Sequence, residues 1–126
     1  MRWMAIIVVS LAASLATLAP ARSEPAMTAG DLQQLCTGED HVSRNACRIY
    51  ILGVTQGIGV GVRMTRGNAA TGTPCVPADI SAETLEQTVK ARLAEDLAKR
   101  PADRDLEASG FIGAVLLSAF PCKKHP

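Results

Sequence analysis

The chain has 126 residues, of which 13 are lysine or arginine and 12 are aspartate or glutamate, so its formal net charge at pH 7 is only +1. Nucleic-acid-binding domains carry a basic excess on one face, and this composition therefore argues against that class of function. A chain of this length favours one domain with a single modest hydrophobic core.

The first 23 residues have the features of a secretory signal peptide. The basic residue Arg2 precedes an apolar or small run over residues 5–19, and Ala19 and Ala21 supply the small side chains that a signal peptidase reads. The run is shorter than the roughly 20 residues that span a bilayer. We therefore expect cleavage of residues 1–23, which would leave a soluble exported domain over residues 24–126 with a net charge of zero or slightly below.

Two helices are predicted in the first half of this domain. Residues 28–36 form a short helix, because Thr28 and Asp31 have the spacing of a capping box. Residues 43–64 form a long helix, for which Ser43 is the expected N-cap.

The second half begins with a linker over residues 67–77, which contains too much glycine and proline to be helical. Ser81 is the expected cap of a third helix that Pro101 ends. Its apolar side chains recur at four-residue spacing at Leu85, Val89, Leu93 and Leu97. Its opposite charges at the same spacing predict a solvated face, namely Glu86 with Lys90, Glu95 with Lys99, and Asp96 with Arg100.

A fourth helix is expected to begin at Asp103 or Asp105, because the apolar residues after this point recur with helical spacing until Pro121 ends the pattern. The predicted fold class is therefore all-α, a small disulfide-stapled bundle of about four helices.

Four cysteines lie in the exported domain, and they are expected to form disulfides. Four cysteines in a short exported chain predict two disulfide bonds, for which there are three pairings. The sequence holds no C-x-x-C motif, and its two histidines are not placed at metal-ligand spacing. Neither a metal site nor a redox centre is expected, and the predicted disulfide residues are Cys36, Cys47, Cys75 and Cys122.

The helix directions favour one pairing. If the second, third and fourth helices run down, up and down, Cys75 and Cys122 both lie at the lower end of the bundle. Cys36 and Cys47 then lie together at the upper end, across the short connection between the first two helices. We therefore expect the pairs Cys36–Cys47 and Cys75–Cys122.

The long helix contains Gly53, Gly57 and Gly61 at four-residue spacing. This stripe would let another helix or a second subunit approach closely, although the same glycines would also fray the helix end. Thr55 and Gln56 interrupt the apolar stretch, either as the lining of a partner-binding groove or as the polar side of an ordinary amphipathic helix. The stripe lacks the full phosphate-binding glycine pattern, so no nucleotide cofactor is expected.

No catalytic motif occurs in the chain. The sequence has neither the G-x-S-x-G elbow of serine hydrolases nor the H-E-x-x-H motif of zinc proteases. No histidine lies in a setting that suggests a general base. We therefore predict that the protein is not an enzyme, has no catalytic, cofactor-binding or metal-binding residues, and acts by binding another protein.

A set of motifs that covers nearly all of the exported domain resembles the Rap-type (Tai-like) immunity protein family, which is associated with type VI secretion in Gram-negative bacteria. The motifs are those of residues 28–32 (TAGDL), 35–36 (LC), 46–54 (ACRIYILGV), 75–77 (CVP), 80–85 (ISAETL) and 119–122 (AFPC). The resemblance implies an all-helical periplasmic protein that is often dimeric. It also implies that the four cysteines are those of the family.

Two functions follow as hypotheses. The resemblance implies an immunity protein that binds and occludes a secreted peptidoglycan amidase in the periplasm, without a cofactor, and that protects the producing cell. The alternative is a general periplasmic helical binding or acid-stress chaperone-like module, which would respond to protonation of carboxylates that are stabilised in the folded state. Both hypotheses predict a protein partner, with a homodimer as a further expectation.

Overall fold

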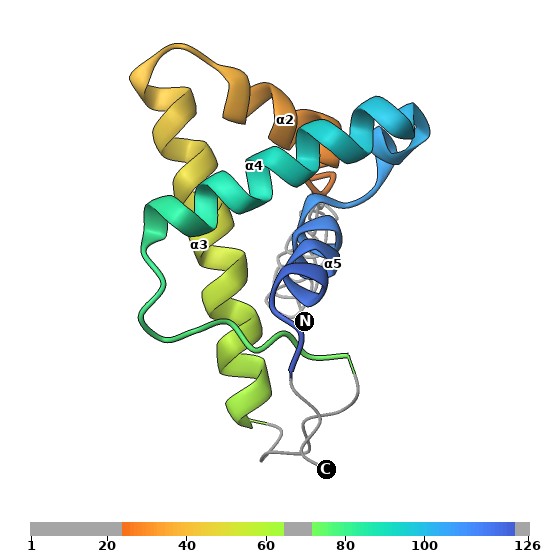
Figure 1. The fold of residues 1–126 in the computed structure, drawn as a ribbon. Coiled ribbons are helices and arrows are strands. Elements are labelled where there is room, and N and C mark those ends of the chain that lie inside the picture. The colour runs from red at the N-terminus through yellow and green to blue at the C-terminus, as the bar shows by residue number, and fades with distance from the viewer. Residues whose placement is uncertain (1–23, 65–71, 123–126) are drawn as a thin grey trace, which may run out of the picture.

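The computed structural model describes residues 24–64 and 72–122, and within these ranges the protein is all-α, as predicted. The α-helices are α2 (Ala29–Thr37), α3 (His41–Met64), α4 (Ala82–Lys99) and α5 (Ala108–Ala119), with a 3₁₀ helix, η2 (Pro101–Asp105), between the last two (Figure 1). Across the described ranges, none of these helices is long and apolar enough to span a membrane. The predicted signal peptide, the linker residues 67–71 and His125 lie outside the described residues.

The first two helices begin at side-chain caps. The predicted capping box is present, because the Asp31 amide donates to Thr28 Oγ1 at 3.2 Å and the Thr28 amide donates to Asp31 Oδ2 at 3.0 Å. The prediction that α3 begins with a Ser43 cap is wrong. The Ser43 amide donates to Asp40 Oδ1 at 2.9 Å, so α3 starts earlier, at His41. Hydrogen bonds from Thr28 and from Ser43 hold the pKa values of Asp31 and Asp40 below their ordinary range.

The fourth helix starts later than predicted. Ser81 caps α4 as expected, accepting from the Thr84 amide at 3.0 Å. The segment after Pro101 forms the 3₁₀ helix η2, and α5 begins only at Ala108, so neither Asp103 nor Asp105 opens it. The physical reason is a tertiary pairing: the Leu106 carbonyl accepts from the Ala29 amide at 2.8 Å, and the Ala108 amide donates to the Met27 carbonyl at 2.9 Å. The extended backbone between η2 and α5 is therefore hydrogen-bonded to the first residues of the domain and is not available to form a helix.

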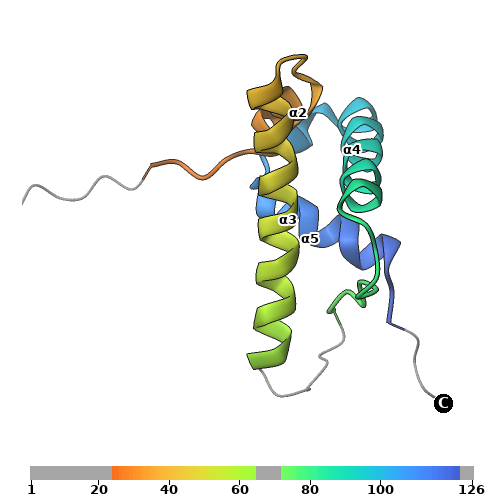
Figure 2. The same cartoon turned by 90° about the vertical axis from the view of Figure 1, so that its left-hand side faces the viewer.

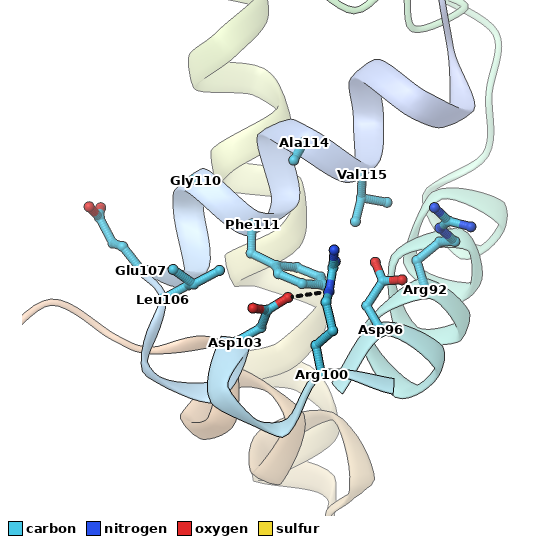
Figure 3. Close-up of a pocket in the computed structure, with 10 residues that line it drawn as sticks. All are labelled: Arg92, Asp96, Arg100, Asp103, Leu106, Glu107, Gly110, Phe111, Ala114 and Val115. Atoms are coloured by element: carbon cyan, nitrogen blue, oxygen red, sulfur yellow. Dashed lines mark ion pairs between the residues drawn. The ribbon is translucent and has the colours of Figure 1, made fainter. Parts of the chain in front are cut away.

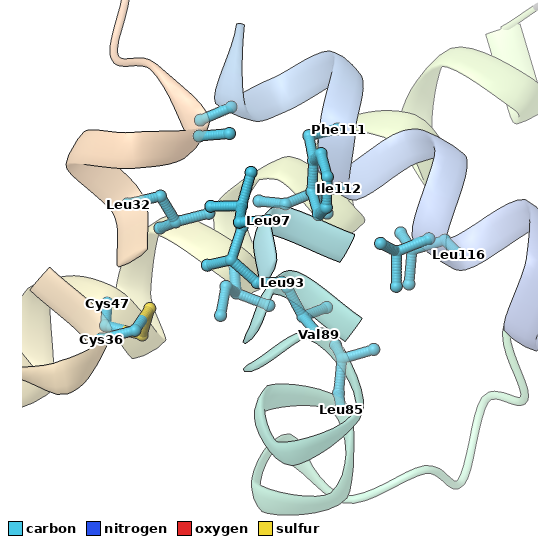
Figure 4. Packing of buried hydrophobic residues seen from close by; sticks show 14 residues of the cluster. Leu32, Cys36, Cys47, Leu85, Val89, Leu93, Leu97, Phe111, Ile112 and Leu116 are labelled. Carbon is cyan, nitrogen blue, oxygen red and sulfur yellow. A yellow bond between two sulfur atoms is a disulfide. The ribbon is translucent and has the colours of Figure 1, made fainter. Parts of the chain in front are cut away.

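The helices enclose one core around α3, which contacts α2, α4 and α5. In Figure 1, α3 runs down one side of the fold, α4 crosses it, and α5 lies below α4 on the other side of the fold. Each apolar residue predicted on the inner side of α4 is buried, and α2 and α5 complete the cluster (Figure 4). The fully buried side chains of largest volume are Leu32, Ile51, Leu93, Leu97, Ile112, Leu116, Val89 and Cys47.

The cysteines are joined in the two expected pairs. Cys36 and Cys47 connect the end of α2 to the second turn of α3, with a Cα–Cα distance of 5.0 Å, and both are buried. Cys75 and Cys122 connect the segment before α4 to the segment after α5, with a Cα–Cα distance of 4.9 Å, and both are exposed. Beside this second pair the Cys75 amide donates to the Phe120 carbonyl at 2.8 Å. One disulfide therefore lies inside the core, and the other lies at the surface.

Two glycines are expected to respond in opposite directions to alanine. A Cβ at Gly38, in the turn between α2 and α3, would lie 2.5 Å from Ser43 Cβ, whereas a Cβ at Gly57, inside α3, would meet nothing within 4 Å. Gly38→Ala should therefore lower the free energy of unfolding by about 1–3 kcal/mol through overpacking. Gly57→Ala should raise it by up to about 1 kcal/mol, because alanine favours the helix. Urea unfolding of both variants checks the pair, and a loss of stability in Gly57→Ala would contradict it.

Candidate protein-binding face

The outward side of α3 carries a row of exposed apolar side chains. Val42 is 79% exposed, Ile49 is 61% exposed and Met64 is 77% exposed. The helical repeat of about 100° per residue places these side chains on one face of α3. We define the α3 stripe as the exposed residues on that face, namely Val42, Ile49, Gly53, Val60 and Met64. In Figure 2, α3 lies along one side of the fold, where a partner could reach it.

Three glycines of α3, Gly53, Gly57 and Gly61, lie on or beside this stripe and do not serve packing inside the domain. A Cβ added at Gly53, Gly57 or Gly61 would have no heavy atom within 4 Å. The predicted close approach to another helix of the same chain is therefore absent from the described residues. A close approach does occur elsewhere, because a Cβ at Gly113 of α5 would lie 3.8 Å from Ile58 Cδ1 of α3. The α3 stripe is smooth and without a packing partner in the described chain.

The two polar residues in the middle of α3 have different roles. Thr55 donates its hydroxyl to the Ile51 carbonyl at 2.8 Å, which satisfies it within the helix. Gln56 is exposed next to Gly57. Of the predicted pair, only Gln56 is placed to contact a partner.

A hollow of about 390 Å³ lies between the first half of α3 and α4, and we call it the basic hollow. Within it, Arg48 Nε donates to Glu86 Oε2 at 2.6 Å, and Lys90 Nζ lies 3.7 Å from Glu86 Oε1. Glu86 is only 7% exposed, and its hydrogen bond and charge raise the pKa of Arg48 above its ordinary value. The residues that line the hollow are His41, Arg44, Asn45, Arg48 and Glu86.

Sequence reasoning did not find this arrangement. Glu86 is 38 positions from Arg48, and its spacing to Lys90 indicated only a solvated helical pair. The predicted pair of Glu95 and Lys99 is present at 2.6 Å. The predicted pair of Asp96 and Arg100 is not, because Arg100 Nε bonds to Asp103 Oδ2 at 2.8 Å instead. A buried glutamate opposite an arginine on another helix has no local signal in the sequence.

A second hollow, of about 380 Å³, opens between the end of α4, η2 and the start of α5 (Figure 3). Phe111 and Val115 of α5 contribute its apolar lining, while Arg92 and Asp96 of α4 and Arg100, directly after α4, lie at its edge. Arg92 lies 3.6 Å from Glu95, and its Nε is buried without a hydrogen-bond partner. The charged residues around this hollow are of both signs and are partly paired, so the hollow does not favour a ligand of either charge.

The remaining site predictions are that the protein has no metal site and that its four cysteines form disulfides. Within residues 24–64 and 72–122 no group of three or more histidine, cysteine, aspartate or glutamate side chains is arranged to hold a metal ion. His41 Nδ1 lies 3.4 Å from Arg44 Nη2. The four cysteines are spread between two ends of the fold and act as cross-links.

Comparison with known proteins gives one match. A family model described as Rap1a immunity proteins matches residues 28–122, from the capping box of α2 to the last cysteine. Searches of curated proteins and of solved structures find no match.

Proposed function

We propose that this chain, which belongs to the Rap1a immunity protein family, protects its producer by binding a secreted peptidoglycan amidase in the periplasm and covering the amidase active site. The family itself indicates an immunity protein against a secreted effector. The amidase, the periplasm and the mode of inhibition are the parts that we propose. The observation that carries the binding role is the exposed α3 stripe.

The physical argument starts from the apolar exposure of α3. A contiguous exposed apolar surface typically marks a protein interface, because covering it removes apolar area from water. A helix of the length of α3 (His41–Met64) extends for about 36 Å at about 1.5 Å per residue, which is long enough to cross an active-site cleft. The disulfide at Cys47 fixes the first half of α3 to α2. A rigid face of this kind binds with little loss of conformational entropy.

The cellular location is supported by the cysteines. Disulfides form and persist in oxidising compartments such as the bacterial periplasm. Cleavage of residues 1–23 as a signal peptide would deliver the domain there. Fractionation of cells followed by mass determination of the protein tests this part directly, because a cytoplasmic, full-length chain would exclude it.

The test of the binding role expresses the reading frames adjacent to this chain's gene one at a time in the periplasm of a host cell, and takes a toxic amidase among them as the effector. We expect the wild-type chain to restore growth and to co-purify with the effector. The double variant Ile49→Ser with Val60→Ser should bind at least about tenfold more weakly, since such contacts contribute about 1 kcal/mol or more each. The matched control is Leu117→Ser, because Leu117 is a 37% exposed leucine on α5 and lies outside the α3 stripe.

Two outcomes would contradict this proposal. If the wild-type chain neither restores growth nor co-purifies, the immunity role against this effector fails. If the effector binds and Leu117→Ser weakens binding as much as the double variant, the α3 stripe is not the interface. If the stripe binds a second copy of this chain instead of the effector, sedimentation of the free chain will give a mass twice that of the monomer.

A further inference from the structure

We infer that the basic hollow beside the α3 stripe is a binding site for a carboxylate side chain, an aspartate or glutamate of the effector protein. This inference deepens the proposed function and rests on it, because the effector supplies the carboxylate. It predicts the chemistry of the partner surface. That surface is apolar where it faces Val42 and Ile49, and acidic where it faces Arg44 and Arg48.

The first step of the argument is the set of available donors. Arg48 gives Nε–H to Glu86, which leaves the other four of its five N–H donors without a carboxylate partner in the described ranges. Arg44 Nη2 lies 3.4 Å from His41 Nδ1, and Arg44 has no ion-pair partner in the described ranges. Two guanidinium groups with open donors line one hollow of about 390 Å³. Arginine donors match the geometry of a carboxylate and bind it through paired hydrogen bonds.

The second step is the charge balance of the hollow. The one carboxylate in its lining, Glu86, is already contacted by both Arg48 and Lys90, and the charge of Glu83 on the same helix also acts on Arg48. Arg44 forms no ion pair with an acidic side chain of the described residues. Glu86 acts as a positioning residue, because it is buried on α4 and holds the half-exposed Arg48 side chain toward the hollow. The site is therefore preorganised for an incoming negative charge.

The third step is that a second copy of this chain is a poor occupant. The helix α3 contains arginines and no aspartate or glutamate along its whole length. A parallel second α3 would place one basic hollow against the other. An antiparallel second α3 would place residues 57–64 there, whose one charged residue is Arg63. Either arrangement brings like charges together, which disfavours the wrong partner.

The experiment measures the dissociation constant of the catalytically silenced effector for three chains. Arg44→Glu changes the hollow, and Arg63→Glu is the matched control, with the same change of charge at the far end of the same helix. We expect about tenfold or greater weakening by Arg44→Glu and less than about threefold weakening by Arg63→Glu. Salt from about 0.05 to about 0.5 M should weaken wild-type binding more than binding of Arg44→Glu.

The outcomes separate this inference from the proposed function. If the effector binds and both reversals weaken it equally, or neither weakens it, the hollow is not the carboxylate site while the immunity role stands. If the effector does not bind the wild-type chain, the immunity role fails. The amide chemical shifts of the free chain then show whether the hollow binds a carboxylate. Acetyl-glutamate-amide should then shift residues 41–48, and acetyl-glutamine-amide should not. Equal shifts with both probes, or none, would overturn the inference.

Discussion

Replacement of both Cys75 and Cys122 by serine is expected to lower the free energy of unfolding by about 4 kcal/mol. The two residues are separated by 47 positions, so their bond closes a loop that contains the whole of α4 and α5. In the chain-entropy description, a cross-link over such a loop restricts the unfolded chain strongly, although the division between entropy and enthalpy is disputed. A loss of this size is a large fraction of the stability of a small domain. Denaturant unfolding in oxidising buffer measures it.

The control for this prediction is the same comparison in a dithiol reductant. Both disulfides are then open in the wild-type chain, so the difference that comes from the Cys75–Cys122 cross-link should disappear. A difference that persists would show that the serines act through packing and not through the loss of the bond. Peptide mapping under non-reducing conditions adds a direct check, because a peptide that joins Cys36 to Cys75 would contradict both pairs.

Leu93→Ala is expected to lower the free energy of unfolding by about 2–5 kcal/mol. Leu93 is 1% exposed at the middle of α4, with buried side chains of α2, α3 and α5 in the same cluster (Figure 4). Truncation removes buried methyl groups and leaves a cavity that rigid neighbours fill only in part. The resulting loss should appear in the denaturation midpoint without a change in the slope of the transition.

The matched control is Leu106→Ala, which deletes the same atoms from a leucine that is 51% exposed. Surface substitutions of this kind usually change stability by less than about 0.5 kcal/mol. The backbone carbonyl of Leu106, which accepts from Ala29, is unaffected by the change. If Leu106→Ala destabilises the domain as much as Leu93→Ala does, burial is not what gives Leu93 its importance.

The features that the sequence predicted correctly are those with local causes. The capping box at Thr28 and the Ser81 cap depend on residues three positions apart, and both are present. The four-residue recurrence of Leu85, Val89 and Leu93 identified the buried side of α4, because a periodic apolar row must face the core. Fold class and family followed from such short-range patterns.

The features that it missed depend on contacts between distant residues. The start of α5 moved because the backbone at Leu106 bonds to Ala29, a preference that no nearby residue reveals. The basic hollow could not be foreseen, since it needs the crossing of α3 and α4 to bring Arg48 to Glu86. Similarly, periodicity placed Ile49 on α3 but could not tell that this part of the helix would remain uncovered.

The hydrogen bonds between the domain's first residues and the segment before α5 also affect the order in which the domain folds. The Ala29 amide and the Met27 carbonyl find their partners at Leu106 and Ala108, so these contacts form only after nearly all of the chain has been made. Contacts between such distant positions slow folding, because a long loop must close before they form. Completion of this contact therefore comes late in folding, after the segment before α5 has been made.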